Sequence, residues 1–281
     1  MKQILFLLFI GCLGFQRLNA QATTFFDDDR IIFDRYVKSM DDKKHLPLGE
    51  LIIETAMFFM ETPYVAATLE KEPEQLIVNL RELDCTTLVE NVIALARTMK
   101  QVTPSFEAFC TQLQQIRYRE NTINNYTDRL HYFTDWIFEN SRKNLVRDET
   151  KALGGQPYRL NLNFMSTHPE SYMQLKSNPD LIAVIAQKEK EISSRETCAI
   201  IPEAQIETCR VGMKNGDIVC FVTQIEGLDV SHTGFIYWQD QKLGFLHASS
   251  TAKKVIIDPL SLQEYVKGIR TTIGVMIVRP L

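Results

Sequence analysis

The sequence lacks the cysteine and histidine spacings that build metal sites. None of its six cysteines forms a CxxC pair, and the five histidines do not cluster with them at zinc-ligand spacing. We therefore expect neither a metal nor another cofactor. The chain also lacks a basic surplus, because 31 lysines and arginines face 35 acidic residues and the formal net charge is −4. Nucleic-acid binding needs a concentrated basic surface, so nucleic acid is not an expected partner.

Long apolar runs are missing after the first twenty residues, which argues against a transmembrane anchor in the mature chain. The one apolar run covers residues 4–15, follows the basic Lys2 and precedes small residues at Ala20 and Ala22. This order is typical of a secretory signal peptide, and the run is too short to span a bilayer. We predict a signal peptide over residues 1–20, with cleavage after Ala22 as an alternative. The protein is then exported, and the periplasm is its expected location.

Cys12 would be the lipidated residue of a lipoprotein signal, a weaker alternative because Phe9 stands where such signals usually carry leucine. Removal of the signal leaves five cysteines, and an odd number in an exported protein leaves at least one thiol unpaired. Cys198 and Cys209 are close enough in the chain to close a short loop, although two free thiols fit the sequence equally well. The composition does not indicate an oligomeric state.

The hydrophobic periodicity changes once along the chain, from helical to strand-like. Residues 41–192 are mainly helical in pattern, whereas short alternating runs dominate from Gly216 onward. Helices followed by strands predict an α+β fold, which we expect to form a single domain over residues 23–281. Residues 122–180 are rich in aromatic and polar side chains, and we interpret them as an insertion that shapes a surface site. The predicted strands are 216–224, 230–239, 242–250, 253–258 and 271–279.

Cys85 lies where a helix is expected to begin. Leu88, Val92 and Leu95 recur at helical spacing after it, and Asp84 is a good N-cap residue. The unpaired N–H groups and the dipole of a helix N-terminus stabilise a thiolate, which is the nucleophilic form of cysteine. The charge of Asp84 opposes this effect unless its carboxylate is engaged as the cap. The alternative is a small buried cysteine that only fills the core.

Two histidines fall on one predicted hairpin. If its strands pair around a two-residue turn at residues 240–241, His232 and His247 become diagonal neighbours on the same face of the sheet. One imidazole can then orient the other, as a catalytic triad requires. In the alternative interpretation the hairpin carries a plain polar face, and the Ser249-Ser250 pair supplies the runner-up nucleophile.

Several segments, in this order, resemble the NlpC-type papain-like cell-wall amidases. Residues 62–65 (TPYV) resemble the family's PY element, and residues 84–89 (DCTTLV) resemble its DCSGLV nucleophile motif, with Thr86-Thr87 in place of Ser-Gly. Residues 231–234 (SHTG) and 246–250 (LHASS) resemble its base strand and its third-residue strand. The resemblance implies a papain-like α+β fold in which the nucleophile helix packs on an antiparallel sheet.

The resemblance also implies the catalytic roles. Cys85 would be the nucleophile, His232 its base and His247 the residue that orients the base, while Tyr64 would help to bind the oxyanion. Other activities remain as alternatives: an endopeptidase that cuts the γ-D-glutamyl–diaminopimelate bond, a transglutaminase-like enzyme on the same triad, and a non-catalytic wall-binding module.

The closer similarity is to a secreted branch first catalogued as a domain of unknown function, whose members are N-acetylmuramoyl-L-alanine amidases acting on anhydro-muropeptides. The similarity is carried by residues 117–119 (RYR), 128–132 (DRLHY), 135–136 (DW) and 163–166 (NFMS). It implies muropeptides as partners and the amide between sugar and L-alanine as the scissile bond.

Aromatic faces hold sugars and arginine suits acidic groups, so these segments supply the expected residue types. The alternative is that the aromatic side chains belong to the core and the arginines are solvated. The predicted substrate-binding residues are Asp84, Arg119, Arg129, His131, Tyr132, Trp136 and Ser166.

Overall fold

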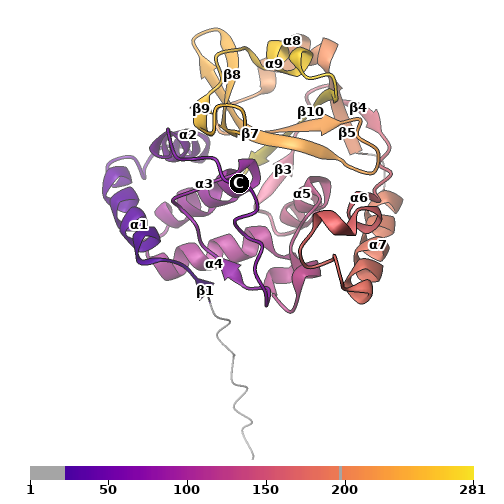
Figure 1. The fold of residues 1–281 in the computed structure, drawn as a ribbon. Helices are drawn as coiled ribbons and strands as arrows, with labels where there is room; N and C mark the ends of the chain where they lie inside the picture. Colours follow the sequence, from indigo (N-terminus) through magenta and orange to yellow (C-terminus); the bar gives the residue numbers. More distant parts are fainter. Residues whose placement is uncertain (1–22, 196–197) are drawn as a thin grey trace, which may run out of the picture.

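The structure, a computed structural model, describes residues 23–195 and 198–281 and consists of a helical layer packed against a sheet (Figure 1). The predicted α+β class is therefore confirmed. Within the described ranges, no helix is both long and apolar enough to cross a membrane. The predicted signal peptide and the alternative lipidation site at Cys12 lie outside the described residues. The helices are α1 (Asp27–Met40), α2 (Leu48–Phe58), α3 (Cys85–Met99), α4 (Phe106–Arg117), α5 (Phe133–Arg142), α6 (Phe164–Thr167), α7 (Pro179–Ser194), α8 (Ile206–Cys209) and α9 (Leu262–Gly268).

The large sheet has eight strands in the order β4-β5-β10-β6-β7-β8-β9, with β3 paired to β10. All its strand pairs are antiparallel. A separate small sheet joins β1 (Thr23–Thr24) to β2 (Leu76–Ile77) in parallel. The strands of the large sheet are β3 (Val146–Asp148), β4 (Gln156–Tyr158), β5 (Cys198–Pro202), β6 (Ile218–Thr223), β7 (Val230–Gln239), β8 (Lys242–Ser249), β9 (Lys254–Ile257) and β10 (Thr272–Pro280).

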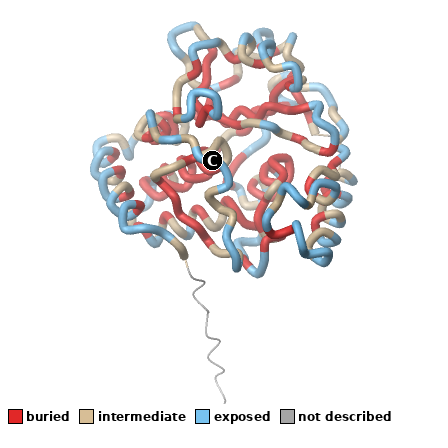
Figure 2. The backbone as a smooth tube through the Cα atoms, in the orientation of Figure 1, coloured by how far each residue is buried: buried red, intermediate tan, exposed pale blue. Residues whose placement is uncertain are grey.

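Helix α3 is the centre of the core. Every residue from Thr87 to Ala96 is buried, and the helix packs on α2, α4 and strand β7 (Figure 2). Strand β6 is buried on both faces, because one face meets the helical layer and the other is covered by α8 and α9. A helix enclosed on all sides has a fixed axis, so its first residue is held at a fixed place above the sheet.

The aromatic segment over residues 122–180 packs as a unit of its own. Tyr126, Tyr132 and Met165 form a third hydrophobic cluster with residues of α7. This cluster lies beside α5, on the side of the helical layer away from α1 (Figure 1). The segment predicted as a surface insertion therefore buries several of its aromatic rings.

Candidate active site

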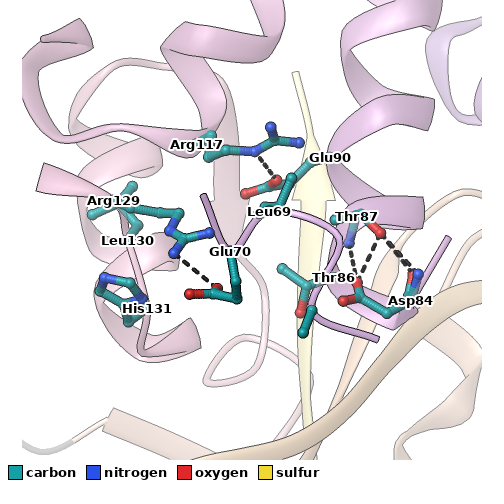
Figure 3. A pocket seen from close by; sticks show the side chains of 11 residues that line it. Leu69, Glu70, Asp84, Thr86, Thr87, Glu90, Arg117, Arg129, Leu130 and His131 are labelled. Atoms are coloured by element: carbon teal, nitrogen blue, oxygen red, sulfur yellow. Dashed lines mark hydrogen bonds and ion pairs between the residues drawn. The ribbon is translucent and has the colours of Figure 1, made fainter. Parts of the chain in front are cut away.

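Asp84 caps the helix that begins at Cys85. Its Oδ1 accepts hydrogen bonds from the backbone N–H and the hydroxyl of Thr87, both at 2.8 Å, and its own N–H donates to Thr87 Oγ1 at 2.8 Å (Figure 3). The predicted N-cap is confirmed. Thr87, one of the two departures from the family motif, completes this capping box. The carboxylate is thus engaged as the cap and does not point freely at the sulfur.

Strand β7 is tied to the start of α3 by Thr233. The Thr233 hydroxyl donates to the backbone carbonyl of Cys85 at 3.0 Å. His232 is the preceding residue of the same strand, so its backbone lies next to the residue that contacts the helix start, while its ring lies near Phe221 and Tyr265. Thr233 lies in the SHTG segment that resembles the base strand, but the sequence alone predicts no role for it. Its position directly after His232 was the sequence feature that could have identified it as a residue of the site.

The two histidines form a contact pair. His232 Nε2 lies 2.5 Å from His247 Nδ1, and the ring planes are nearly perpendicular at 81°. The hairpin has the predicted register, since Phe235 pairs with Leu246 and Gln239 with Lys242. Asp240 in the turn adopts a positive φ of 54°, as a two-residue hairpin turn requires.

Gly234 makes room for this pair. A Cβ atom at this position would lie 2.7 Å from the carbonyl oxygen of Leu246 and 3.0 Å from Cβ of His247. Any side chain here would push β8 away and displace the His247 ring from its partner.

Asp258 lies behind the histidine pair and was not predicted. Its Oδ2 is 3.2 Å from His247 Nε2, although the angle is not that of a hydrogen bond. Its backbone N–H donates to the carbonyl of Phe245 at 3.0 Å, which fixes its place at the end of β9. The predicted strand over residues 253–258 contained this position, but only the pairing with β8 shows which histidine it faces.

Tyr265 of α9 is a second residue that sequence reasoning missed. Its ring centroid lies 5.7 Å from that of His247 and 4.7 Å from that of Phe245. Burial, together with the nearby Asp258 and Cys85, raises the pKa of Tyr265 to about 12. The Tyr265 ring therefore covers the histidine pair on the face of the sheet opposite α3.

Burial keeps the catalytic candidates neutral. It raises the pKa of the Cys85 thiol to about 11, with the Asp84 charge acting in the same direction and hydrogen bonds from Thr233 and Thr86 opposing it. It lowers the pKa of His232 to about 4. The thiolate expected from the helix N-terminus is therefore not the resting form. Desolvation and the adjacent carboxylate outweigh the helix N-terminus, and the site rests as thiol and neutral imidazole.

Tyr64 lies beside the start of α3. Its backbone N–H donates to the carbonyl of Lys253 at 2.9 Å, and it forms an isolated parallel bridge with Leu83. Burial raises the pKa of Tyr64, and the nearby Cys85 and Asp84 add to the increase. The PY segment thus links the base of α3 to strand β9, with its tyrosine near the sulfur.

A pocket of about 130 Å³ opens next to the nucleophile helix (Figure 3). Arg129 donates to Glu70 Oε1 at 2.9 Å, and Arg117 donates to Glu90 Oε2 at 2.6 Å. Both ion pairs face the pocket, so its wall presents carboxylates and guanidinium groups together. We call it the α3 pocket, and its lining residues are Ala67, Leu69, Glu70, Asp84, Thr86, Thr87, Glu90, Arg117, Arg129, Leu130 and His131.

Three of the predicted binding residues lie at this pocket: Asp84, Arg129 and His131. His131 Nε2 lies 2.9 Å from the carbonyl oxygen of Tyr126, and its ring packs on that tyrosine with centroids 4.3 Å apart. Burial, together with the charge of Arg129, lowers the pKa of His131 to about 3. His131 therefore offers a neutral ring to the pocket.

The other predicted binding residues are engaged inside the protein. Arg119 forms ion pairs with Asp135 and with Glu139. Trp136 has no exposed surface and stacks on Phe133, so the structure gives it no face for a ligand.

Tyr132 and Ser166 meet at Glu189 of α7. The Tyr132 hydroxyl donates to Glu189 Oε1 at 2.6 Å, and the Ser166 backbone N–H donates to the same oxygen at 3.1 Å. The Ser166 hydroxyl donates to the carbonyl of Asn163 at 3.2 Å. Neither residue lines the α3 pocket.

All five cysteines of the described residues are free thiols, including Cys198 and Cys209. The disulfide bond left open by the sequence is therefore not formed in this structure. No group of three or more histidine, cysteine or carboxylate side chains between residues 23 and 195 or 198 and 281 is arranged to hold a metal ion.

Acid is expected to destabilise the fold through three buried histidines. Burial lowers the pKa of His131 and His247 to about 3 and of His232 to about 4, below the ordinary value of about 6.5. As the pH falls from about 6.5 to about 4, the unfolded chain takes up protons that the folded chain does not. Each histidine then removes up to about 1.4 kcal/mol of stability per pH unit.

Urea unfolding at pH 7, 6 and 5 measures this slope. Replacement of His131 by asparagine should make the slope shallower, whereas replacement of the exposed His168 by glutamine should leave it unchanged. A slope that is equal in all three proteins would contradict the buried, neutral state of His131.

Comparisons with known proteins identify the family of the chain. Residues 54–273 match the AmiA-like family, described as N-acetylmuramoyl-L-alanine amidase-like. A crystal structure named as an N-acetylmuramoyl-L-alanine amidase from Bacteroides uniformis is 37% identical, with a TM-score of 0.80, over 83% of this chain and 98% of that chain. A structure named as a putative xylanase from Bacteroides fragilis is 38% identical, with a TM-score of 0.77, over 81% of this chain and 99% of that chain.

A more distant Legionella pneumophila protein, at 21% identity and a TM-score of 0.68, shares the fold over 91% of this chain and 95% of its own. Comparison with curated proteins gives no match. Because the family match covers most of the sequence, the chain belongs to the AmiA-like, N-acetylmuramoyl-L-alanine amidase-like family.

Proposed function

We propose that this family member is an exported cysteine amidase with a papain-like catalytic arrangement. It hydrolyses the amide between N-acetylmuramic acid, in its 1,6-anhydro form, and the L-alanine of peptidoglycan fragments. The observation that carries the proposal is the contact between His232 and His247 on a hairpin that Thr233 ties to Cys85. The family match supports the amide, and the likeness to the anhydro-muropeptide branch supports the sugar form.

The histidine pair has a preferred direction of proton placement. The Asp258 carboxylate, 3.2 Å from His247 Nε2 but without hydrogen-bond geometry, favours a proton on that nitrogen through its charge, which leaves His247 Nδ1 as an acceptor. His232 Nε2–H then donates to that nitrogen, as the 2.5 Å separation requires. The remaining nitrogen of His232, Nδ1, carries the lone pair. This tautomer makes His232 the base, and His247 with Asp258 holds it in that form.

Catalysis begins from the neutral pair. The proton of the Cys85 thiol passes to His232 Nδ1 as the sulfur attacks the amide carbonyl, so charge separates only during attack. Backbone N–H groups at the start of α3, with the Tyr64 hydroxyl, stabilise the oxyanion. His232 then protonates the leaving amine of L-alanine. Water, deprotonated by His232, releases the acid from the thioester and restores the thiol.

The α3 pocket suits the part of the substrate next to the scissile bond. It adjoins Asp84 and Thr86 on either side of Cys85, and its volume of about 130 Å³ accommodates one small residue or substituent. Arg117 and Arg129 are the cations on its wall, and each is paired with a carboxylate, Glu90 and Glu70 respectively, so the wall suits a ligand with both polar donors and acceptors. The rest of a muropeptide must extend beyond this pocket.

Identification of the broken bond tests the proposal. The mature protein is incubated with defined anhydro-muropeptides and reduced muropeptides, and the products are identified by mass spectrometry. We expect a free anhydro-sugar and an intact stem peptide that begins with alanine. Cleavage after D-glutamate would instead identify an endopeptidase, and no cleavage with retained binding would identify a wall-binding module. Amino-terminal sequencing of the exported protein locates the signal cleavage site.

Tyr265 provides a further test, because its ring shields the histidine pair from water. Replacement by phenylalanine keeps the ring, so kcat should change by less than about threefold. Replacement by alanine admits water, and the pKa of His232 should rise from about 4 towards its ordinary value. The acid limb of the kcat/KM profile should then move to higher pH, with kcat lowered by about tenfold. An unmoved acid limb in the alanine variant would exclude this shielding role.

A further inference from the structure

A cavity of about 400 Å³ lies between α1, the end of α2 and the segment that leads into α3. Figure 1 shows α1 and α2 next to each other at one end of the helical layer. We call this cavity the α1–α2 pocket. Its apolar lining residues are Ile32, Phe58, Phe59, Met60 and Leu80, and its polar ones are Arg35, Glu61, Thr62 and Arg81.

The polar rim carries two guanidinium groups, of which one has no counter-charge and the other is paired through a single nitrogen. Arg35 is exposed and makes no ion pair with any residue of the described ranges. Arg81 uses its Nε for Asp29 at 3.1 Å, which leaves its terminal nitrogens for a ligand. The one acid on the rim, Glu61, is already paired with Lys254 at 2.6 Å. Two guanidinium groups above an apolar floor suit a carboxylate on a chain with aliphatic portions.

The α1–α2 pocket is within reach of the nucleophile. Thr62 of the rim comes two residues before Tyr64, and Arg81 comes four residues before Cys85. The two segments run side by side, because the Leu83 N–H donates to the carbonyl of Pro63 at 3.0 Å. Four residues span at most about 14 Å, so a peptide of three or four residues can reach from the sulfur to the rim.

The α1 wall is a feature that the family match does not include. The matched range begins at residue 54, whereas α1 ends at Met40. Ile32 and Arg35 are therefore contributed by a part of this chain outside the matched range. A ligand contact there would add recognition beyond the shared catalytic apparatus.

We propose that the α1–α2 pocket binds the carboxylate-bearing far end of the stem peptide, with Arg35 and Arg81 as its cations. This proposal rests on the proposed amidase function, since it places the scissile amide at Cys85. The aliphatic part of a diamino acid lies on the apolar floor, and its carboxylate meets the guanidinium groups at the rim. Longer acidic stems are therefore bound more tightly than a single alanine.

The test compares Arg35→Gln with a matched control, Lys38→Gln, which removes the same charge from an exposed position on the same helix. The kcat/KM of the mature protein is measured on anhydro-muropeptides whose stems contain one, two, three or four residues. We expect Arg35→Gln to lose about three- to tenfold on the three- and four-residue stems, mainly through KM, and nothing on the alanine substrate. Lys38→Gln should match the wild type throughout.

Binding of the free stem tripeptide, L-Ala-γ-D-Glu-diaminopimelate, and of its carboxyl-amidated form is measured by calorimetry. The acidic form should bind more tightly, and Arg35→Gln should remove the difference. If Arg35→Gln and Lys38→Gln have the same kcat/KM on every substrate, the proposed role of the α1–α2 pocket is refuted, whereas the proposed amidase function is unaffected. If the wild-type protein cleaves no muropeptide, the proposed amidase function is refuted. The binding of the tripeptide alone then tests the proposed role of the α1–α2 pocket.

Discussion

Replacement of Cys85 by alanine is expected to lower kcat/KM for muropeptide amide hydrolysis by at least about 10³-fold, because the thioester cannot form. Cys85 is the first residue of α3 and is partly buried, before the fully buried stretch that begins at Thr87, so folding should be preserved. Replacement by serine should be nearly as damaging, since a hydroxyl with a much higher pKa than a thiol must be deprotonated by the same histidine. The readout is the release of stem peptide, with circular dichroism as the check on folding.

Cys110 supplies the matched control for this experiment. It is a half-buried thiol on α4, and its pKa is raised to about 12, chiefly by burial. Replacement of Cys110 by serine should leave the release of stem peptide within about twofold of the wild type. Retained activity in Cys85→Ala, or equal loss in both variants, would refute the assignment of Cys85 as the nucleophile.

The hairpin that carries His232 and His247 was predictable because its geometry is local. A two-residue turn fixes the register of β7 and β8, and the register alone places His232 and His247 on one face. The cap at Asp84 was predictable for the same reason, since it depends on residues three apart in the chain. Neither inference required knowledge of how distant segments pack.

Asp258 and Tyr265 were not predictable because their positions depend on tertiary packing. Asp258 faces His247 only through the pairing of β9 with β8, which are joined by a turn that has no two-residue signal. Tyr265 reaches the histidines only because α9 folds back over the sheet. The sequence pattern predicts a strand that ends at Asp258 but does not show which residues that strand faces.

The substrate-binding predictions show that residue type alone does not distinguish a binding residue from a core residue. Aromatic and arginine residues suit sugar binding and core packing equally, so the residue types of Tyr132 and Trp136 could not separate these uses. The structure places both rings in the interior, with exposed fractions of 5% and 0%. Helix α1 was also missed: its first turn carries three consecutive acids from Asp27, which suit a helix N-terminus but interrupt the apolar periodicity.

The largest effect on stability is expected at the ion pair between Glu90 of α3 and Arg117 of α4. Both side chains are almost fully buried, and Arg117 also donates to the carbonyl of Ile77 at 2.7 Å. Replacement of Glu90 by glutamine leaves a guanidinium charge in the interior without its counter-charge. The free energy of unfolding should fall by about 3 to 5 kcal/mol, measured by urea denaturation.

An exposed pair provides the matched control, because Glu107 lies 3.1 Å from Arg30 with 71% of its side chain exposed. Glu107→Gln should cost less than about 1 kcal/mol, since solvent screens that pair. The double replacement Glu90→Leu with Arg117→Met should recover much of the loss, because it removes both charges and fills the space. If Glu90→Gln costs no more than Glu107→Gln, then water reaches Arg117 through the α3 pocket and its charge is not desolvated. The same measurement therefore reports whether the pocket beside the nucleophile excludes solvent before a substrate binds.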